Sequence, residues 1–180
     1  MMRLQPLPAD EWDEAVQRSL SVMLPPERCN PEDAGTLMST LVRHPKLTRA
    51  FLRFSGYLLL GSTLPARIRE QAILRVAHRR GCDYEWSHHV DIAKEAGLSD
   101  AEIAAAQTGE TNDEFDRAVF TAVDELDEKS NVSDQTWTAL CERLDERERM
   151  DLIFTIGGYI ALAMAINTFG VELENDQKGK

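Results

Sequence analysis

Hydrophobic residues recur along the chain at the spacing of helices. Apolar positions separated by three or four residues form stripes over most of the sequence, as in Phe115, Val119, Ala122 and Leu126. No segment of useful length alternates between apolar and polar positions in the manner of a strand. The pattern therefore predicts an all-α protein.

Prolines, glycines and capping residues mark the expected ends of these helices. Ser99 followed by Glu102 is a capping box, and Gly81 and Gly97 are expected to end the helices that precede them. We expect helices over about 10–20, 31–43, 45–60, 65–80, 82–96, 99–107, 112–126, 133–144 and 146–170.

Composition and charge exclude several classes of protein. The chain has 180 residues, of which 43% are apolar, enough to bury a core. Its net charge of −11 argues against binding to nucleic acid or to an anionic membrane, because both need an excess of Lys and Arg. Residues 99–150 contain 15 acids and 5 bases and so hold almost all of the excess. This acidic segment is either a docking face or, as we favour, the solvated side of outer helices.

The three cysteines, Cys29, Cys82 and Cys141, lie far apart in the sequence. An odd and sparse set does not indicate a disulfide framework, so a reducing compartment is the simpler expectation. The first residues lack the apolar segment of a secretory signal peptide. Together these features predict a cytoplasmic protein.

One apolar segment, residues 152–171, carries no charge and reaches the lower length limit of a membrane span. It contains Gly157, Gly158 and Asn167, and acidic residues rather than a basic anchor follow it. We therefore expect no membrane contact. The helix is predicted to be buried inside the fold or at an interface between subunits.

Reactive side chains concentrate between residues 67 and 97. On a helix that begins at Cys82, residues 82, 85, 86 and 89 share one face, whereas position 88 is rotated by about 120°. Cys82 in the first turn is expected to gain thiolate character from the helix dipole. His89 is expected to form a hydrogen bond with Glu85, one turn away.

Glu70 lies on the apolar side of the preceding helix. A carboxylate on that side is expected to be partly desolvated, which favours a role in proton transfer. The alternative is an ion pair with Arg67 or Arg69 at the surface. The residues alone leave both interpretations open.

Taken together, these residues resemble a known family. The pattern Glu70, eleven residues, Cys82-x-x-Glu85-x-x-x-His89 is similar to that of the carboxymuconolactone decarboxylase and alkyl hydroperoxidase D (AhpD-like) superfamily. The resemblance covers about 45–171 and is carried by residues 69–77, 81–89, the Ala-Gly-Leu-Ser at 96–99 and the C-terminal run 157–171. It implies an AhpD-like helical fold, in which a buried antiparallel helix pair carries the site, and assembly as a homo-oligomer.

The resemblance also suggests a division of the chain and a set of roles. Residues 1–44 would form an N-terminal helical extension, 45–171 the family domain and 172–180 a frayed tail. By position, Glu70 would be the relay carboxylate, Cys82 the first cysteine of a Cys-x-x-Cys peroxidase site and His89 its histidine. The second cysteine is replaced by Glu85, so the two-thiol cycle of the family cannot run here.

Two enzymatic hypotheses follow. The favoured one is a single-cysteine peroxidase, in which Cys82 attacks a hydroperoxide, Glu70, Glu85 and His89 manage the protons, and an external thiol restores the cysteine. The other is an enzyme of the carboxymuconolactone decarboxylase type. The same three acid–base groups would act on a small carboxylate or lactone, and the substrate anion would be held by Arg75, Arg79 or Arg80.

Two further hypotheses need no such chemistry. Cys82, Glu85, His89 and perhaps His88 could bind a metal ion, although we expect a site without metal or other cofactor. Alternatively, the chain is an oligomeric interaction protein that kept the fold and lost the redox pair. The aromatic residues Tyr84 and Trp86 are candidate substrate-binding residues, with core or interface packing as the commoner use of such side chains.

Overall fold

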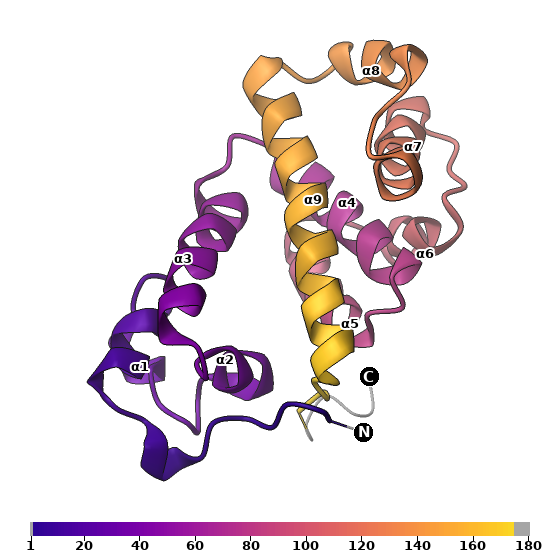
Figure 1. The fold of residues 1–180 in the computed structure, drawn as a ribbon. Helices are drawn as coiled ribbons and strands as arrows, with labels where there is room; N and C mark the ends of the chain where they lie inside the picture. The colour runs from indigo at the N-terminus through magenta and orange to yellow at the C-terminus, as the bar shows by residue number, and fades with distance from the viewer. Residues whose placement is uncertain (1, 175–180) are drawn as a thin grey trace. The chain divides into compact units, whose positions relative to one another are not determined.

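The computed structural model describes residues 2–174, and that part of the chain is helical with no strand. The all-α prediction is therefore confirmed, and Figure 1 shows the nine α-helices of the described range. Two short 3₁₀ turns, η1 (Ala9–Glu11) and η2 (Pro26–Arg28), and a π-helical turn, η3 (Tyr57–Gly61), accompany them. The helices are α1 (Glu14–Leu20), α2 (Gly35–Leu41), α3 (Pro45–Gly56), α4 (Ala66–Arg79), α5 (Asp83–Glu95), α6 (Asp100–Thr108), α7 (Glu114–Lys129), α8 (Asp134–Cys141) and α9 (Glu146–Phe169).

The polar residues that begin the helices act as predicted. Ser99 and Glu102 form the complete capping box of α6, and Ser133 caps α8 through the amide of Thr136. The predicted start of α2 is wrong by several residues. The side chain of Asn30 accepts hydrogen bonds from the amides at 32 and 33, so these residues form a turn and the helix begins only at Gly35.

The contacts divide the chain into two compact units, and the first comprises residues 1–61 and 165–180. In it, α1 packs on α3 around a core of Val16, Leu20, Cys29, Ala34, Val42 and Leu52. The amides of Arg3 and Leu4 donate to the carbonyl of Phe169, which joins the two ends of the chain. Of the predicted tail 172–180, residues 175–180 lie outside the described range, and the Glu174 carboxylate accepts from the Thr36 amide. The predicted boundary at residue 44 stays a prediction.

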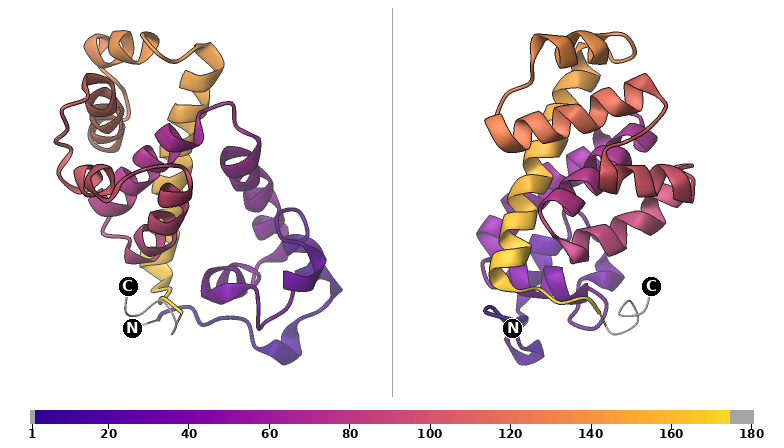
Figure 2. Two further views of the ribbon diagram at one scale, coloured as in Figure 1. Left: turned by 180° about the vertical axis from the view of Figure 1, so that it is seen from behind. Right: turned by 90° about the vertical axis from the view of Figure 1, so that its right-hand side faces the viewer.

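The second unit, residues 62–164, contains α4–α8 and most of α9. Its centre is α4, which packs against α5, α6 and α7 (Figure 2). One cluster joins α4, α7, α8 and α9 through residues such as Ile73, Val119, Leu140 and Ile156. A second cluster joins α4 to α5, α6 and α7. These apolar contacts provide the main stabilisation of the unit.

A carboxylate on α9 anchors the segment before α4. Asp151 is buried, and its Oδ2 accepts hydrogen bonds from the Thr63 amide (2.7 Å), the Thr63 hydroxyl (2.8 Å) and the Ser62 hydroxyl (3.0 Å). We name this group the Asp151 clasp. It satisfies backbone and side-chain donors at a point where the chain turns into a buried helix.

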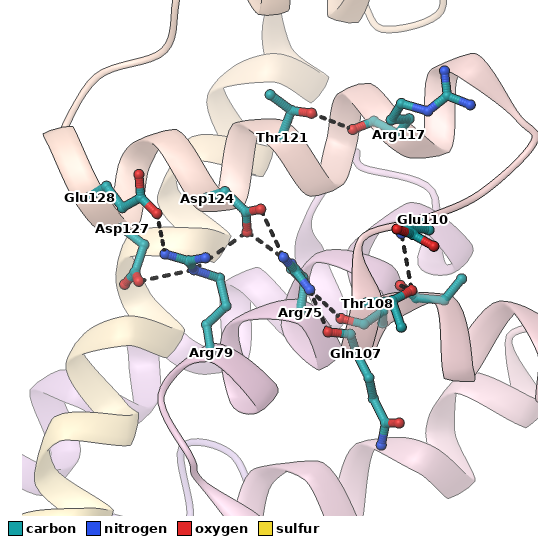
Figure 3. A network of polar contacts seen from close by, with 12 residues as sticks. Arg75, Arg79, Gln107, Thr108, Glu110, Arg117, Thr121, Asp124, Asp127 and Glu128 are labelled. Atoms are coloured by element: carbon teal, nitrogen blue, oxygen red, sulfur yellow. Dashed lines mark hydrogen bonds and ion pairs between the residues drawn. The ribbon is translucent and has the colours of Figure 1, made fainter.

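Arginines of α4 bind acids of α7, as Figure 3 shows. Arg75 donates to both oxygens of Asp124 (2.8 Å each) and to the carbonyls of Ala106 and Gln107 at the end of α6 (3.1 and 2.7 Å). Arg79 contacts Asp124, Asp127 and Glu128. Part of the acidic segment is thus neutralised within the unit. The solvated face that we favoured from the sequence does not describe Asp124 and Asp127, whose side chains are 30% and 12% exposed, whereas Glu128 is 58% exposed and fits it.

The apolar helix α9 is only partly buried. Within the described residues it alone is long and apolar enough to cross a membrane, and 39% of its most apolar stretch is buried. This is weak evidence for a span, since core helices of soluble proteins have the same composition. Leu152, Ile156 and Tyr159 belong to the core of the second unit, whereas Phe154 and Met164 are exposed. The cytoplasmic location and the homo-oligomer stay predictions.

Candidate functional site

The turn between α4 and α5 places the reactive side chains. Gly81 adopts a left-handed conformation (φ 55°), and the Cys82 amide donates to the Ala77 carbonyl, which closes α4. Cys82 is the N-cap of α5. Because α5 returns along α4, residues 19 positions apart come into contact, which is how Glu70 meets His89.

Glu70 is the centre of a buried charged group. Its side chain has no exposed surface, Oε1 accepts from Arg69 Nε at 3.0 Å, and Oε2 lies 2.6 Å from His89 Nδ1. The expected desolvation of Glu70 is thus confirmed. The alternative, an ion pair at the surface, is wrong about the place: Glu70 does pair with Arg69, but the pair is buried. Arg67 binds Asp116 and Glu102 instead. An ionised Glu70 holds the proton of His89 on Nδ1 and leaves Nε2 as the basic nitrogen.

The predicted hydrogen bond between His89 and Glu85 is wrong. One helical turn brings the two side chains to the same side of α5, but α4 packs against that side and supplies Glu70 as the partner of Nδ1. Helix periodicity describes neighbours within α5 and not the helix that covers it. His89 therefore owes its orientation to another helix.

The Glu85 carboxyl group is buried beside the Cys82 thiol. The residue is 3% exposed, and neither carboxyl oxygen has an N–H or O–H donor among the described residues. Burial raises the pKa of Glu85 to about 8. At neutral pH this side chain is therefore mostly a neutral acid that can donate a proton or a hydrogen bond.

Cys82 lies beside Glu85 and is 1% exposed. Burial, and then the charge of Glu85, raise the pKa of the Cys82 thiol to about 12, although the amide of Glu85 has a smaller opposite effect. The expected thiolate is thus not favoured. The helix terminus does act in the predicted direction, but desolvation is larger because the sulfur is enclosed.

This environment predicts that the Cys82 thiol reacts slowly with alkylating reagents. In the native protein at pH 7.5 we expect iodoacetamide to modify Cys141, which is exposed, and to leave Cys82 and Cys29 unmodified, because both are buried and both have raised pKa values. Peptide mass spectrometry over time gives the three rates separately. Alkylation of Cys82 as fast as that of Cys141 would contradict the enclosed, protonated sulfur.

Tyr159 of α9 completes the group, and the sequence reasoning did not assign it a role. Its ring lies edge-on against His89, with centroids 5.0 Å apart and planes at 85°. Burial and the charges of Glu70 and Glu85 raise the pKa of the hydroxyl, so it stays protonated. A tyrosine on the buried side of the uncharged stretch 152–171 was the available signal, since a buried hydroxyl needs a polar neighbour.

The two aromatic residues predicted to bind substrate pack against other side chains. Trp86 packs with the cluster of Leu74 and Phe120, and its ring lies 6.1 Å from that of His78. Tyr84 stacks on His88, whose Nδ1 contacts the Tyr84 carbonyl. Their roles in substrate binding stay predictions.

The arginines proposed to hold a substrate anion have other partners. Arg75 and Arg79 bind acids of α7, and Arg80 binds Asp127. That expectation is therefore wrong, because the acids of a neighbouring helix use these guanidinium groups. As to metals, no group of three or more His, Cys, Asp and Glu is placed to hold an ion within residues 2–174.

Residues 45–128 match the model of the carboxymuconolactone decarboxylase family. This match covers just under half of the chain. The matching segment runs from α3 into α7 and contains Glu70, Cys82, Glu85 and His89, but not Tyr159. The resemblance inferred from the residues is thereby confirmed. Comparison with curated proteins gives no match.

Solved structures show the same fold over almost the whole chain. An uncharacterised peroxidase-related protein from Ralstonia eutropha JMP134, with an alkylhydroperoxidase AhpD core, has a TM-score of 0.75 at 18% identity and covers 97% of this chain and 94% of its own. An uncharacterised peroxidase-related protein from Silicibacter sp. TM1040 has a TM-score of 0.77 at 13% identity and covers 98% of this chain and 95% of its own. A debrominase in its apo form has a TM-score of 0.71 at 16% identity and covers 97% of this chain and 94% of its own. The fold is thus AhpD-like.

Proposed function

We propose that this protein is a general acid–base enzyme of the carboxymuconolactone decarboxylase type, acting on a small carboxylate or lactone. One observation carries the proposal: two buried carboxyl groups of α4 and α5 lie in opposite environments. Glu70 is bound to Arg69 and His89, whereas Glu85 is buried beside the Cys82 thiol and has a pKa of about 8. Two carboxyl groups in such different environments are suited to different roles in proton transfer.

The roles follow from the contacts. His89 is the base through Nε2, since Glu70 occupies Nδ1 and stabilises the imidazolium that forms when a proton is taken. Arg69 donates to the other oxygen of Glu70 and so fixes the orientation of that carboxylate toward His89. Glu85 is the acid, because it still holds its proton at neutral pH. Cys82 takes no part in this reaction and fills space beside Glu85.

Exposure of the side chains indicates where a substrate would reach the site. Glu70, Cys82 and Glu85 are at most 3% exposed, whereas the His89 side chain is 9% exposed. His89 is therefore the residue of this group that a substrate would reach first. A site this enclosed suits a small molecule and excludes bulk water from the proton transfer.

The experiment is a panel of lactones and β-keto acids followed by NMR in D₂O, which detects both product and deuterium incorporation. We expect His89→Gln to lower the rate by about 100-fold, the lower range for loss of a general base. Cys82→Ser is the matched control, and its rate should equal that of the wild type. Loss of activity in Cys82→Ser, or a panel in which nothing reacts, contradicts the proposal.

A single-cysteine peroxidase is the second candidate, favoured by the position of Cys82 beside Glu85 and by the peroxidase-related structures of the same fold. The Cys82 thiolate would attack a hydroperoxide oxygen and form a sulfenic acid, while the departing alkoxide takes a proton from Glu85. Two equivalents of external thiol would then reduce the sulfenic acid back to the thiol, and they would leave as one disulfide together with water. It ranks second because a thiol with a pKa near 12 is thiolate at pH 7 in a fraction on the order of 10⁻⁵. Dimedone labelling of Cys82 after hydroperoxide treatment would favour it.

A further inference from the structure

The guanidinium group of Arg69 is only partly used by the protein. Its Nε donates to Glu70 Oε1 at 3.0 Å, and no described residue accepts a hydrogen bond from Nη1 or Nη2. A guanidinium group has five N–H donors, and four of them are on these two nitrogens. The side chain is 13% exposed, and its Nη atoms are not among the fully buried atoms without a partner, so both retain some access to solvent.

Arg75, on the same helix, shows how a comparably buried arginine is satisfied. Its side chain is 9% exposed, and its Nε, Nη1 and Nη2 donate to both oxygens of Asp124 and to the carbonyls of Ala106 and Gln107. A charged group that is mostly removed from water lowers stability unless its donors find acceptors. The outer nitrogens of Arg69 therefore need an acceptor that the described residues do not supply.

Hydrogen bonds place Arg69 next to the proposed base. Glu70 Oε1 accepts from Arg69 Nε, and Glu70 Oε2 lies 2.6 Å from His89 Nδ1, so a single carboxylate separates the guanidinium group from the imidazole. The Glu70 side chain has no exposed surface, whereas those of Arg69 and His89 are 13% and 9% exposed. The two residues that retain exposure are thus the two ends of this hydrogen-bonded chain.

We infer that Arg69 binds the carboxylate of the substrate, and that the substrate is a small carboxylic acid rather than an uncharged lactone. The inference deepens the proposed acid–base function and rests on it. Nη1 and Nη2 form a planar fork that matches the two oxygens of a carboxylate. Because Glu70 already holds Nε, the fork is ordered before the acid binds, which lowers the entropic cost of binding. An acid with a short carbon chain suits the small separation between this fork and His89.

Binding of 3-hydroxybutyrate and of its methyl ester tests this inference without any catalysis, because the two probes share a carbon skeleton and differ in charge. NMR signals of the His89 imidazole, identified by their loss in His89→Gln, report binding at this site. We expect the wild-type protein to bind the acid about 10-fold or more tightly than the ester, as for hydrogen bonds to a charged group. Arg69→Gln keeps a donor for Glu70 but lacks the charged fork, so it should bind both probes equally weakly.

The controls separate this inference from the proposed function. Arg117→Gln changes the net charge by the same amount at an exposed position of α7, and it should keep the preference of the wild type for the acid. A preference that is lost in Arg69→Gln, together with a panel in which nothing reacts, contradicts the proposed function alone. The carboxylate site is overturned if the wild type binds neither probe or both equally, or if the preference survives in Arg69→Gln or is lost in Arg117→Gln. Turnover of lactones but of no acid also overturns it.

Discussion

Replacing Asp124 with alanine is expected to lower the free energy of unfolding by about 2 kcal/mol, between the cost of losing an exposed ion pair and that of breaking a buried one, because Arg75 is buried whereas the Asp124 side chain is 30% exposed. Arg75 is 7% exposed and donates to both oxygens of Asp124 at 2.8 Å. Without the carboxylate, the guanidinium keeps only the two carbonyls at the end of α6 and holds an uncompensated charge. The cost arises from that stranded charge rather than from the lost attraction.

Glu128→Ala on the same helix is the matched control. Glu128 also binds an arginine of α4, but its side chain is 58% exposed, so its loss should cost less than about 1 kcal/mol. Urea unfolding followed by circular dichroism gives both values. Equal effects of the two substitutions would show that burial of the ion pair does not decide its contribution.

Replacing Glu85 with glutamine is expected to stabilise the protein at neutral pH, by on the order of 3 kcal/mol at pH 7. The pKa of Glu85 rises from 4.5 to about 8 on folding, so the folded state holds the proton more tightly. Below pH 4.5 Glu85 is protonated in both the folded and the unfolded protein, so its ionisation does not change the free energy of unfolding. Between pH 4.5 and about 8 only the unfolded chain loses its proton, so the stability of the wild type falls as the pH rises through that window.

The measurement is the free energy of unfolding of wild type and Glu85→Gln at half-unit steps from pH 4 to 8. The difference between them should grow with pH in this range. Glu110→Gln, in an exposed loop, is the control, and its free energy of unfolding should follow that of the wild type at every pH. A constant difference between wild type and Glu85→Gln would mean that the carboxyl group ionises normally in the folded state.

Much of the fold could be predicted because local chemistry determines it. Helix starts at Ser99 and Ser133 follow from side chains that bond their own backbone, and this needs no knowledge of the rest of the molecule. Asn30 shows the limit of such reasoning. Its side chain also bonds local backbone, but it holds a turn where the proline and acids after it indicated a helix.

The residues of the candidate site could be predicted from the sequence, whereas their contacts with other helices could not. Glu70, Cys82, Glu85 and His89 lie within 20 residues, so spacing and resemblance could identify them. The partner of His89 and the state of Cys82 depend on which helix covers α5 and how completely, and a one-dimensional pattern does not contain that information. Tyr159 is 70 residues away from His89, and only packing of α9 joins them.

The Asp151 clasp has a consequence for the site. It fastens residues 62 and 63 to α9 just ahead of α4, and Tyr159 lies two turns further along α9. The start of α4 is thereby fixed against α9, so the clasp sets the register between the helix that carries Glu70 and the helix that carries Tyr159.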